Sequence, residues 1–371
     1  MRVLLVAGGT AGHVYPALAL AEELGREGAA VALAGSPGGF EEEAAATAGL
    51  EFLGIRARGW DRSSVVSLLA AAGLMSVSLT RAVGLVRRWR PEVVVAFGGY
   101  VSLPVGLAAR SLRVPLVLHE QNSVPGLANR VLARRADRIA VTFEDSIGRL
   151  PRPERALLTG NPVRSQILQA RRDDARDRLG LRDGARVLLV FGGSQGAKHL
   201  NEAMLRIADD LMGIQDVVVL HVTGKRDHSW VADALADLGL DPARWLVREY
   251  IQEMGDALAA SDLVVCRAGA TSVAEVCAAG RASVLVPYPF ATEDHQTLNA
   301  RSLEKAGAAV VVPDTELDAP GFAQTVAGLL RDEERLEEMG SAARRLAIPD
   351  AAARLAAVVR DAGGATTGST A

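Results

Sequence analysis

The 371-residue sequence is poor in lysine, cysteine and aromatic residues, and these shortages narrow the classes of protein that it can represent. Its 41 basic and 44 acidic residues give a net charge of −3, which argues against a nucleic-acid-binding protein with a broad basic face. Only three basic residues are lysines, a bias that we attribute to coding rather than to chemistry. The two cysteines, Cys266 and Cys277, lack CxxC spacing, so we expect a buried, reduced pair.

Long hydrophobic runs are also scarce. Residues Ser63–Thr80 form one stretch of about 18 residues without a charge, at the lower limit for a membrane span, but six are Ser or Thr and Gly73 interrupts it. Helical spacing predicts one apolar stripe that packs on a sheet (Val65, Leu68, Ala72, Met75, Leu79, Val83, Val86) and a second, leftover line (Val66, Leu74, Val77, Leu85). A helix that contacts a membrane surface and a purely internal helix both fit this pattern. Because Met1-Arg2 leads directly into a strand, we expect no signal peptide.

Short apolar strands alternate with helical segments along the whole chain. In the first half, strands are expected near Val3–Ala7, Val31–Ala34, Val93–Phe97, Leu116–His119 and Ile139–Thr142. In the second half, they are expected from Val187 and near Val217–Val222, Leu246–Arg248, Leu263–Cys266, Val284–Val286 and Ala309–Val312. The pattern V-L-L-V-x-G-G-[ST]-x-G occurs at Val3–Gly12, where the turn is expected to open a helix at about Val14, and again at Val187–Gly196. The sequence therefore predicts an α/β protein with two Rossmann-like domains, each a parallel sheet covered by helices.

The two glycine-rich loops exclude one enzyme class and leave a second open. Neither loop has the G-x-G-x-x-G spacing, and Ala34-Gly35-Ser36 stands where a ribose-binding acid would end the second strand, so a dehydrogenase is not expected. The second loop does match the G-x-S-x-G elbow of α/β-hydrolases, and Asp262 or Asp294 with His295 would complete the chain order of a triad. The first loop carries Thr10 instead of serine, and no HGGG-type segment occurs. We therefore favour nests of backbone N–H groups that face phosphate in one half and an acceptor in the other.

The stretch Ser261–Asn299 reads as a complete βαβ unit. Its expected parts are a strand at Leu263–Cys266, a helix capped by Thr271 or Ser272 with Glu275 in its first turn, a stop at Gly280, a strand at Ala282–Val286 and a helix that opens at Asp294–Asn299. Arg267 suits a diphosphate, and the Glu275 carboxylate suits two ribose hydroxyls. A helix cap with a solvated carboxylate is the alternative for these residues.

A resemblance to a known family favours the ligand-binding interpretation of Arg267 and Glu275 over the helix cap. The patterns C-R-A-G-A-x-[ST]-x-x-E from Cys266, V-P at Val286, H-Q-x-x-N-A from His295, GGYVS at 98–102 and HEQN at 119–122 resemble the GT-B glycosyltransferases. More closely, nearly the whole chain resembles the MurG family, bacterial N-acetylglucosaminyltransferases that convert lipid I to lipid II in peptidoglycan synthesis. The resemblance implies an inverting transfer from UDP-N-acetylglucosamine without a metal or other cofactor. It also implies a peripheral protein at the cytoplasmic face of the inner membrane, in contact with anionic lipids and not with nucleic acid.

The resemblance also implies a division of the chain. Residues 1–161 would form the acceptor and membrane-facing domain and residues 162–347 the UDP-sugar domain, with a cleft between them and the junction at Asn161–Arg164. A helix at about 348–362 would pack back on the first domain, and residues 363–371 would be a disordered tail.

The resemblance assigns roles to individual residues. His13 is the candidate base, Glu120 with His119 is a rival base or orienting pair, and a structural histidine is the alternative for His13. The expected substrate-binding residues of the first half are Thr10, Ala11, Gly12, Tyr100, Asn122, Asn129 and Arg164. Those of the second half are Ser194, Gln195, Gly196, Asn201, Ile251, Arg267, Ala270, Thr271, Ser272, Val273, Glu275, His295 and Gln296. Within the second set, Ile251 would hold uracil, Glu275 ribose, and Gln296 with His295 the sugar.

The chain departs from the family pattern in its first loop, where Ala11 replaces a glycine of the usual G-G-T-G-G-H. Either Ala11 has an ordinary φ or the loop is strained. Three alternatives to the transferase stay open: a UDP-N-acetylglucosamine 2-epimerase, another lipid glycosyltransferase such as a diacylglycerol galactosyltransferase, and a non-catalytic membrane scaffold.

Overall fold

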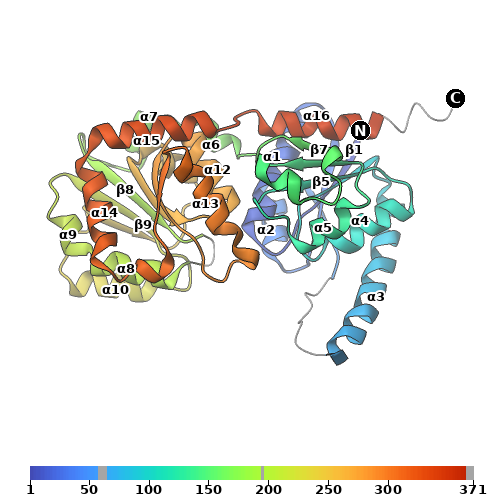
Figure 1. Cartoon of the computed structure of the whole chain (residues 1–371), viewed down its shortest axis with the longest axis horizontal. Coiled ribbons are helices and arrows are strands. Elements are labelled where there is room, and N and C mark those ends of the chain that lie inside the picture. The colour runs from blue at the N-terminus through green and yellow to red at the C-terminus, as the bar shows by residue number, and fades with distance from the viewer. Residues whose placement is uncertain (57–64, 194–195, 365–371) are drawn as a thin grey trace. The chain divides into compact units, whose positions relative to one another are not determined.

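The computed structural model describes residues 1–56, 65–193 and 196–364, with only the backbone described for 65–75. The chain forms two compact units, one of Met1–Arg164 with the segment that starts at Ile348, and one of Ser165–Ala347. Each unit contains a parallel sheet with helices around it (Figure 1), which confirms the predicted fold class.

The first unit is built on a seven-stranded sheet with the order β3-β2-β1-β4-β5-β6-β7. Its strands are β1 (Arg2–Val6), β2 (Ala30–Gly35), β3 (Glu51–Gly54), β4 (Val93–Ala96), β5 (Leu116–Glu120), β6 (Arg138–Val141) and β7 (Ala156–Leu158). The edge strands β3 and β7 were not predicted from the sequence. Central strands such as β4 are buried along their whole length, as expected for a parallel sheet covered on both faces.

Helices cover both faces of this sheet. They are α1 (Ala11–Arg26), α2 (Phe40–Thr47), α3 (Val65–Trp89), α4 (Ser102–Ser111), α5 (Leu127–Ala133) and α16 (Ala351–Gly364), with 3₁₀ turns at Glu144–Arg149 and Pro153–Arg155. One apolar cluster joins the sheet to α3, α4 and α5. The other joins it to α1, α2 and α16, so the last helix completes the core of the first unit, as Figure 1 shows. The helix α16 ends two residues beyond the expected 362, and residues 365–371 of the predicted tail lie outside the described part of the chain.

The second unit has a six-stranded parallel sheet with the order β10-β9-β8-β11-β12-β13. Its strands are β8 (Arg186–Phe191), β9 (Val217–Val222), β10 (Trp245–Arg248), β11 (Leu263–Arg267), β12 (Ala282–Val286) and β13 (Ala309–Val311). Its helices are α6 (Ser165–Gln169), α7 (Arg172–Arg178), α8 (Lys198–Arg206), α9 (Ala208–Met212), α10 (His228–Asp237), α11 (Met254–Ala260), α12 (Ala270–Ala279), α13 (His295–Lys305), α14 (Pro320–Arg331) and α15 (Glu333–Leu346), with 3₁₀ turns at Thr292–Asp294 and Asp314–Glu316.

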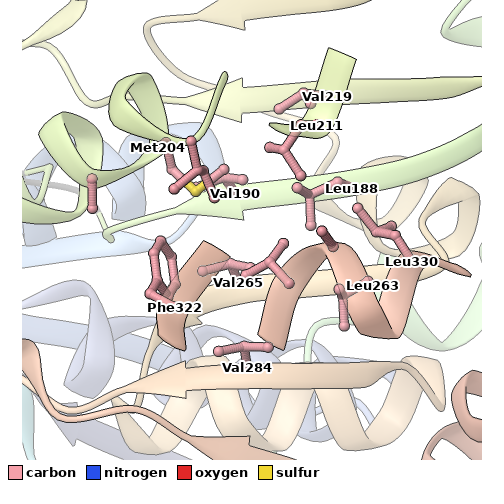
Figure 2. Close-up of a cluster of buried hydrophobic side chains, with 14 of the residues drawn as sticks. Leu188, Val190, Met204, Leu211, Val219, Leu263, Val265, Val284, Phe322 and Leu330 are labelled. Carbon is pink, nitrogen blue, oxygen red and sulfur yellow. The ribbon is translucent and has the colours of Figure 1, made fainter. Parts of the chain in front are cut away.

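The main core of the second unit lies between this sheet and helices on one side of it. Figure 2 shows Leu330 of α14 beside Leu263 of β11 and Phe322 of the same helix near Val265 of β11, and all four side chains are almost fully buried. Cys266 and Cys277 are both buried and free, as predicted. Burial raises the pKa of the Cys277 thiol to about 12, so this side chain behaves as an apolar group.

Two helices begin earlier than the sequence predicted. The helix α1 starts at Ala11 rather than near Val14, and α12 starts at Ala270 after Gly269, so neither Thr271 nor Ser272 is its N-cap. Glu275 therefore lies in the second turn of α12, not the first. The predicted stop at Gly280 is confirmed, because this glycine has a left-handed φ of 62°.

The carboxyl-terminal part of α3 packs in the core of the first unit, whereas its first turns extend away from the unit (Figure 1). Ala82, Leu85, Val86 and Trp89 are buried in the core of the first unit, whereas Val77 is 50% exposed. The assignment of Leu85 to the leftover apolar line was wrong, because Leu85 shares the face of Ala82 and Trp89. In Figure 1 the first turns of α3 extend beyond the rest of the unit. No helix in the described ranges combines the length and the apolar character that crossing a bilayer requires.

Candidate active site

The two glycine-rich loops occupy equivalent places in their sheets. In the first sheet the chain order reverses between β1 and β4, and in the second it reverses between β8 and β11. Loops at the carboxyl ends of such strands form the usual ligand site of a doubly wound sheet. The loop Gly8–Thr10 follows β1, and the loop that begins at Gly192 follows β8. The topology thus assigns one candidate site to each unit.

In the first unit, the loop after β1 packs directly on the loop after β4. A Cβ atom on Gly99 would lie 2.3 Å from the carbonyl oxygen of Gly8, and Gly98 and Gly99 have φ angles of 113° and 81°. Only glycine meets both conditions without strain. Ser102, which is fully buried, donates from Oγ to the Gly98 carbonyl at 2.6 Å and accepts from the Gly98 amide at 3.1 Å. These two hydrogen bonds fix the shape of the loop, a role of Ser102 that the sequence did not reveal.

His13 lies over this pair of loops, in the first turn of α1. Its Nδ1 atom is 2.9 Å from the carbonyl oxygen of Gly8. A carbonyl oxygen can only accept, so the neutral ring that makes this hydrogen bond carries its proton on Nδ1 and has its lone pair on Nε2. A Cβ atom on Gly98 would lie 2.9 Å from that Nε2, so the glycine also makes room for the imidazole. The arrangement presents an oriented, half-buried base at the switch point.

The backbone next to His13 shows whether Ala11 strains the first glycine-rich loop. Thr10 is the N-cap of α1 with extended backbone, and Ala11 and Gly12 are the first two helical residues. Ala11 has helical geometry, so its replacement of a glycine introduces no backbone strain at that position.

The rival bases His119 and Glu120 are enclosed by the protein. His119 is fully buried, donates from Nε2 to the Gly160 carbonyl at 3.0 Å and accepts at Nδ1 from Gln121 Nε2 at 3.0 Å. Burial lowers the pKa of His119 to about 4. Glu120 accepts from the amides of Asn122 at 2.9 Å and Gly126 at 3.0 Å and from Asn129 Nδ2 at 2.9 Å. These contacts give both side chains a structural role in the turn after β5, so we do not retain them as candidate bases.

Four other predicted residues of the first unit have different environments. Asn129 is 3% exposed and its amide is directed at Glu120 and at the His119 carbonyl, so it supports the turn rather than an open surface. Tyr100 is 62% exposed beside the glycine pair, and Asn122 is half-buried. The Arg164 guanidinium carbon lies 4.1 Å from the centre of the Tyr15 ring in α1.

In the second unit, a buried polar cluster lies behind the glycine-rich loop. Asn201 is fully buried; its Nδ2 donates to the Thr223 carbonyl and to Asp227 Oδ2, both at 3.0 Å, and its Oδ1 accepts from His221 Nε2 at 3.0 Å. A Cβ atom on Gly196 would lie 2.6 Å from the Thr223 carbonyl oxygen. Asn201 therefore holds the Thr223 carbonyl, against which Gly196 packs, and does not project to a ligand. The predicted residues Ser194 and Gln195 lie outside the described residues.

Arg267, at the end of β11, is held by an acidic partner that the sequence did not reveal. Its side chain is largely buried, with Nη1 2.5 Å from Asp314 Oδ1 and 3.2 Å from the Pro287 carbonyl oxygen. Its Nε atom is buried without a hydrogen-bond partner within the described part of the chain. The guanidinium is thus fixed in place while one of its donors is left unsatisfied by protein groups.

The remaining predicted donor residues lie around α12 and α13. Ala270, Thr271 and Val273 are buried in the first turn of α12, Ser272 is half-buried, and Glu275 is 4% exposed. Ile251 is half-buried in the loop after β10. Gln296 accepts from the Tyr288 amide at 2.9 Å, and His295 Nδ1 donates to the Thr292 carbonyl at 2.8 Å. Within the described ranges, no group of three or more His, Cys, Asp or Glu side chains is arranged to hold a metal ion.

Comparison with known proteins places this geometry in a family. Residues 3–141 match the glycosyltransferase family 28 N-terminal domain, and residues 187–355 match its C-terminal domain. A relative from Moorella thermoacetica is 45% identical over 95% of this chain and 96% of its own length, and one from Halothermothrix orenii is 40% identical over 97% and 99%. Both are named UDP-N-acetylglucosamine--N-acetylmuramyl-(pentapeptide) pyrophosphoryl-undecaprenol N-acetylglucosamine transferase.

Solved structures agree with this assignment. The crystal structure of Acinetobacter baumannii MurG superimposes with a TM-score of 0.76 at 32% identity and covers 97% of this chain and 99% of that one. A UDP-N-acetylglucosamine 2-epimerase described as putative, from Listeria monocytogenes, reaches a TM-score of 0.70 at 15% identity over 97% and 96% of the two chains, a likeness of fold alone. The chain therefore belongs to glycosyltransferase family 28 and, within it, to the MurG family of N-acetylglucosamine transferases.

Proposed function

We propose that this protein transfers N-acetylglucosamine from UDP-N-acetylglucosamine to the C4 hydroxyl of the muramoyl sugar of lipid I, forming lipid II for peptidoglycan with inversion to a β-1,4 bond. The observation that carries the proposal is the oriented imidazole of His13 at the switch point of the first sheet. Near-full-length relatives with this activity in their names support the choice of substrates.

The acceptor step needs a base for the C4 hydroxyl proton. In our proposal, Nε2 of His13 takes this proton as the hydroxyl oxygen attacks the anomeric carbon, and the Gly8 carbonyl accepts from Nδ1–H throughout. The position of His13 in the first turn of α1 disfavours the imidazolium before reaction, because the helix N-terminus carries partial positive charge. The same partial charge favours the oxyanion that develops on the acceptor.

The donor step needs groups that hold UDP and stabilise the departing diphosphate. We assign this role to the second unit, where the N-terminus of α12 and the Arg267 guanidinium lie together at the end of β11. Arginine and exposed helix N–H groups neutralise phosphate charge by charge-assisted hydrogen bonds. We retain Glu275 for the ribose, Ile251 for uracil, Gln296 with His295 for the sugar, and the Ser194–Gly196 loop for the phosphates, all as parts of this proposal.

The lipid acceptor requires a way to approach a membrane. We propose that the first unit binds the cytoplasmic face of the cell membrane peripherally through α3, where Val77 is exposed and Arg81, Arg87 and Arg88 are exposed on the same helix. An apolar contact flanked by arginines is the usual composition of a helix that lies on an anionic lipid surface.

A transfer assay tests the proposal against its alternatives. Purified protein is incubated with lipid I and radiolabelled UDP-N-acetylglucosamine, with UDP-galactose as a matched donor control, and products are separated by chromatography. We expect label in lipid II from the first donor only. Release of N-acetylmannosamine or its UDP form without lipid I would identify a 2-epimerase, and transfer to diacylglycerol would identify a different lipid glycosyltransferase. Absence of turnover with any donor and acceptor would favour the scaffold.

A further inference from the structure

Asp314 connects two elements of the second unit that are far apart in the sequence. Its Oδ1 atom lies 2.5 Å from Arg267 Nη1, at the end of β11. Its Oδ2 atom lies 2.7 Å from Nδ1 of His199, the second residue of α8. The other ring nitrogen of His199 lies 3.1 Å from Asp318 Oδ1, and Arg206 pairs with the same carboxylate. The result is one continuous charge network: Arg206, Asp318, His199, Asp314 and Arg267.

The geometry of this network specifies the protonation state of His199. Both ring nitrogens face carboxylate oxygens, which can only accept, so both contacts are satisfied only when the ring carries two protons. Hydrogen bonds to Asp314 and, to a smaller extent, Asp318 raise the pKa of His199 above its ordinary value. Burial opposes the charge of Asp314, but hydrogen bonds from His199 and Arg267 outweigh it and lower the pKa of that carboxyl.

The protonation state of His199 changes the charge around Arg267. With His199 protonated, Arg267, Asp314 and His199 sum to one positive charge; with His199 neutral, they sum to zero. Arg206 and Asp318 cancel in both states. Lys198 and Glu202, the other charged side chains on this part of α8, pair with each other at 3.6 Å and also cancel. The net charge of the network therefore depends on one imidazole.

We propose that Asp314 and His199 are positioning residues for Arg267: Asp314 fixes the guanidinium, and protonated His199 balances Asp314 so that the charge of Arg267 is available to a diphosphate. This inference rests on the proposed assignment of the donor diphosphate to Arg267. It predicts that donor affinity is greatest below the raised pKa of His199 and falls as the pH rises through it, because the network then loses its net charge.

Calorimetric titration with UDP-N-acetylglucosamine, without acceptor, from about pH 6 to 8.5 tests this inference. The donor's diphosphate lacks the monoester group that titrates near pH 6, so its charge stays constant over this range. For the wild-type protein we expect about a five-fold loss of affinity across the range, the size expected for one unit charge several ångströms away at intermediate dielectric constant. His199→Gln should bind with the weaker, high-pH affinity at every pH.

Two further variants separate this mechanism from general damage to the fold. Asp314→Asn should move the inflection toward the ordinary histidine value, about pH 6.5, and the NMR titration of the His199 ring should move with it. Lys198→Gln removes a neighbouring cation outside the network and should keep the wild-type inflection. A pH-independent wild-type affinity, or an inflection that persists in His199→Gln, would overturn the inference while leaving the proposed function standing. Failure of the wild-type protein to bind the donor at any pH would contradict both.

Discussion

The Nδ1 atom of His13 lies 2.9 Å from the carbonyl oxygen of Gly8, two positions before the N-cap of the helix that carries the imidazole. This contact fixes the tautomer of the neutral ring, since only Nδ1–H can satisfy the carbonyl. The lone pair is then on Nε2, which lies close to Gly98, where a side chain would crowd the ring. A histidine and a backbone carbonyl thus accomplish the orientation that a carboxylate provides in catalytic triads.

Glu120→Gln should destabilise the first unit without removing catalysis. The glutamate accepts four hydrogen bonds, at Oε1 from the amide and the side chain of Asn122 and at Oε2 from the Gly126 amide and Asn129 Nδ2. The NH₂ group of glutamine cannot accept the two that are made at the oxygen it replaces. We expect a loss of about 1–3 kcal/mol in the free energy of unfolding, measured by urea denaturation. The pH dependence of kcat for the folded variant should match that of the wild type. Loss of the acidic limb of that profile, the fall in kcat as the base becomes protonated, would instead restore Glu120 as a base.

Stability should decline as the pH falls below about 6.5, partly because His119 is buried and neutral. Its folded pKa of about 4 lies below the ordinary value of 6.5, so the unfolded chain binds the proton first. The stability that this histidine contributes is complete above pH 6.5 and is lost as the pH falls toward 4, by up to about 3 kcal/mol.

His119→Gln isolates this contribution, because glutamine keeps an amide donor for the Gly160 carbonyl and does not titrate. The difference in unfolding free energy between wild type and variant should shrink from pH 7 to pH 4. A difference that stays constant over this range would show that His119 does not govern the acid sensitivity.

Glu275→Ala should weaken UDP binding by about 1.5–3 kcal/mol, the usual cost of losing hydrogen bonds to a charged acceptor. The side chain is 4% exposed in α12, so the thermal unfolding curve must be recorded alongside the calorimetry. Ala274→Ser, at the half-buried position just before Glu275, serves as the matched control, because it changes the same turn of α12 and leaves the Glu275 carboxylate in place. Unchanged UDP affinity in a folded Glu275→Ala protein would remove the ribose assignment.

Val77→Glu should reduce association with vesicles that contain anionic lipid, because it adds a negative charge at an exposed apolar position of α3. Its melting temperature should remain close to that of the wild type. Leu85→Ala is the contrasting variant: this side chain is 5% exposed in the core, so it should lose about 2–5 kcal/mol of stability. Vesicle binding by Val77→Glu at wild-type strength would contradict a membrane contact through this part of α3.

The sequence predicted the central strands well because they are buried on both faces and read as continuous apolar runs, as in Val217–Val222. It missed β3 and β7, which are short edge strands with partly exposed residues such as Leu157. Helix starts at Ala11 and Ala270 were missed because Thr10 makes no side-chain capping bond and Gly269 has no side chain to signal a cap.

The residue types of the candidate site followed from motifs, but their supporting contacts did not. Asp314 lies 115 positions from His199, and no local pattern in a single sequence pairs them. The burial of Asn129, Asn201 and Glu120 was missed for a related reason: a polar residue in a motif suggests a ligand, whereas its partners are set by the packing of distant strands and turns. Leu85 shows the limit of prediction from hydrophobic periodicity, because a shift of one helix position moves a side chain from the core face to the exposed face.

The most direct test of the central claim is the transfer assay with His13→Ala, combined with calorimetry of UDP-N-acetylglucosamine. If His13 is the base in the first unit and the second unit binds the donor, kcat should fall by about 10²–10⁴ while donor affinity is unchanged. A folded His13→Ala protein with near-normal kcat would contradict the account and exclude His13 as the base.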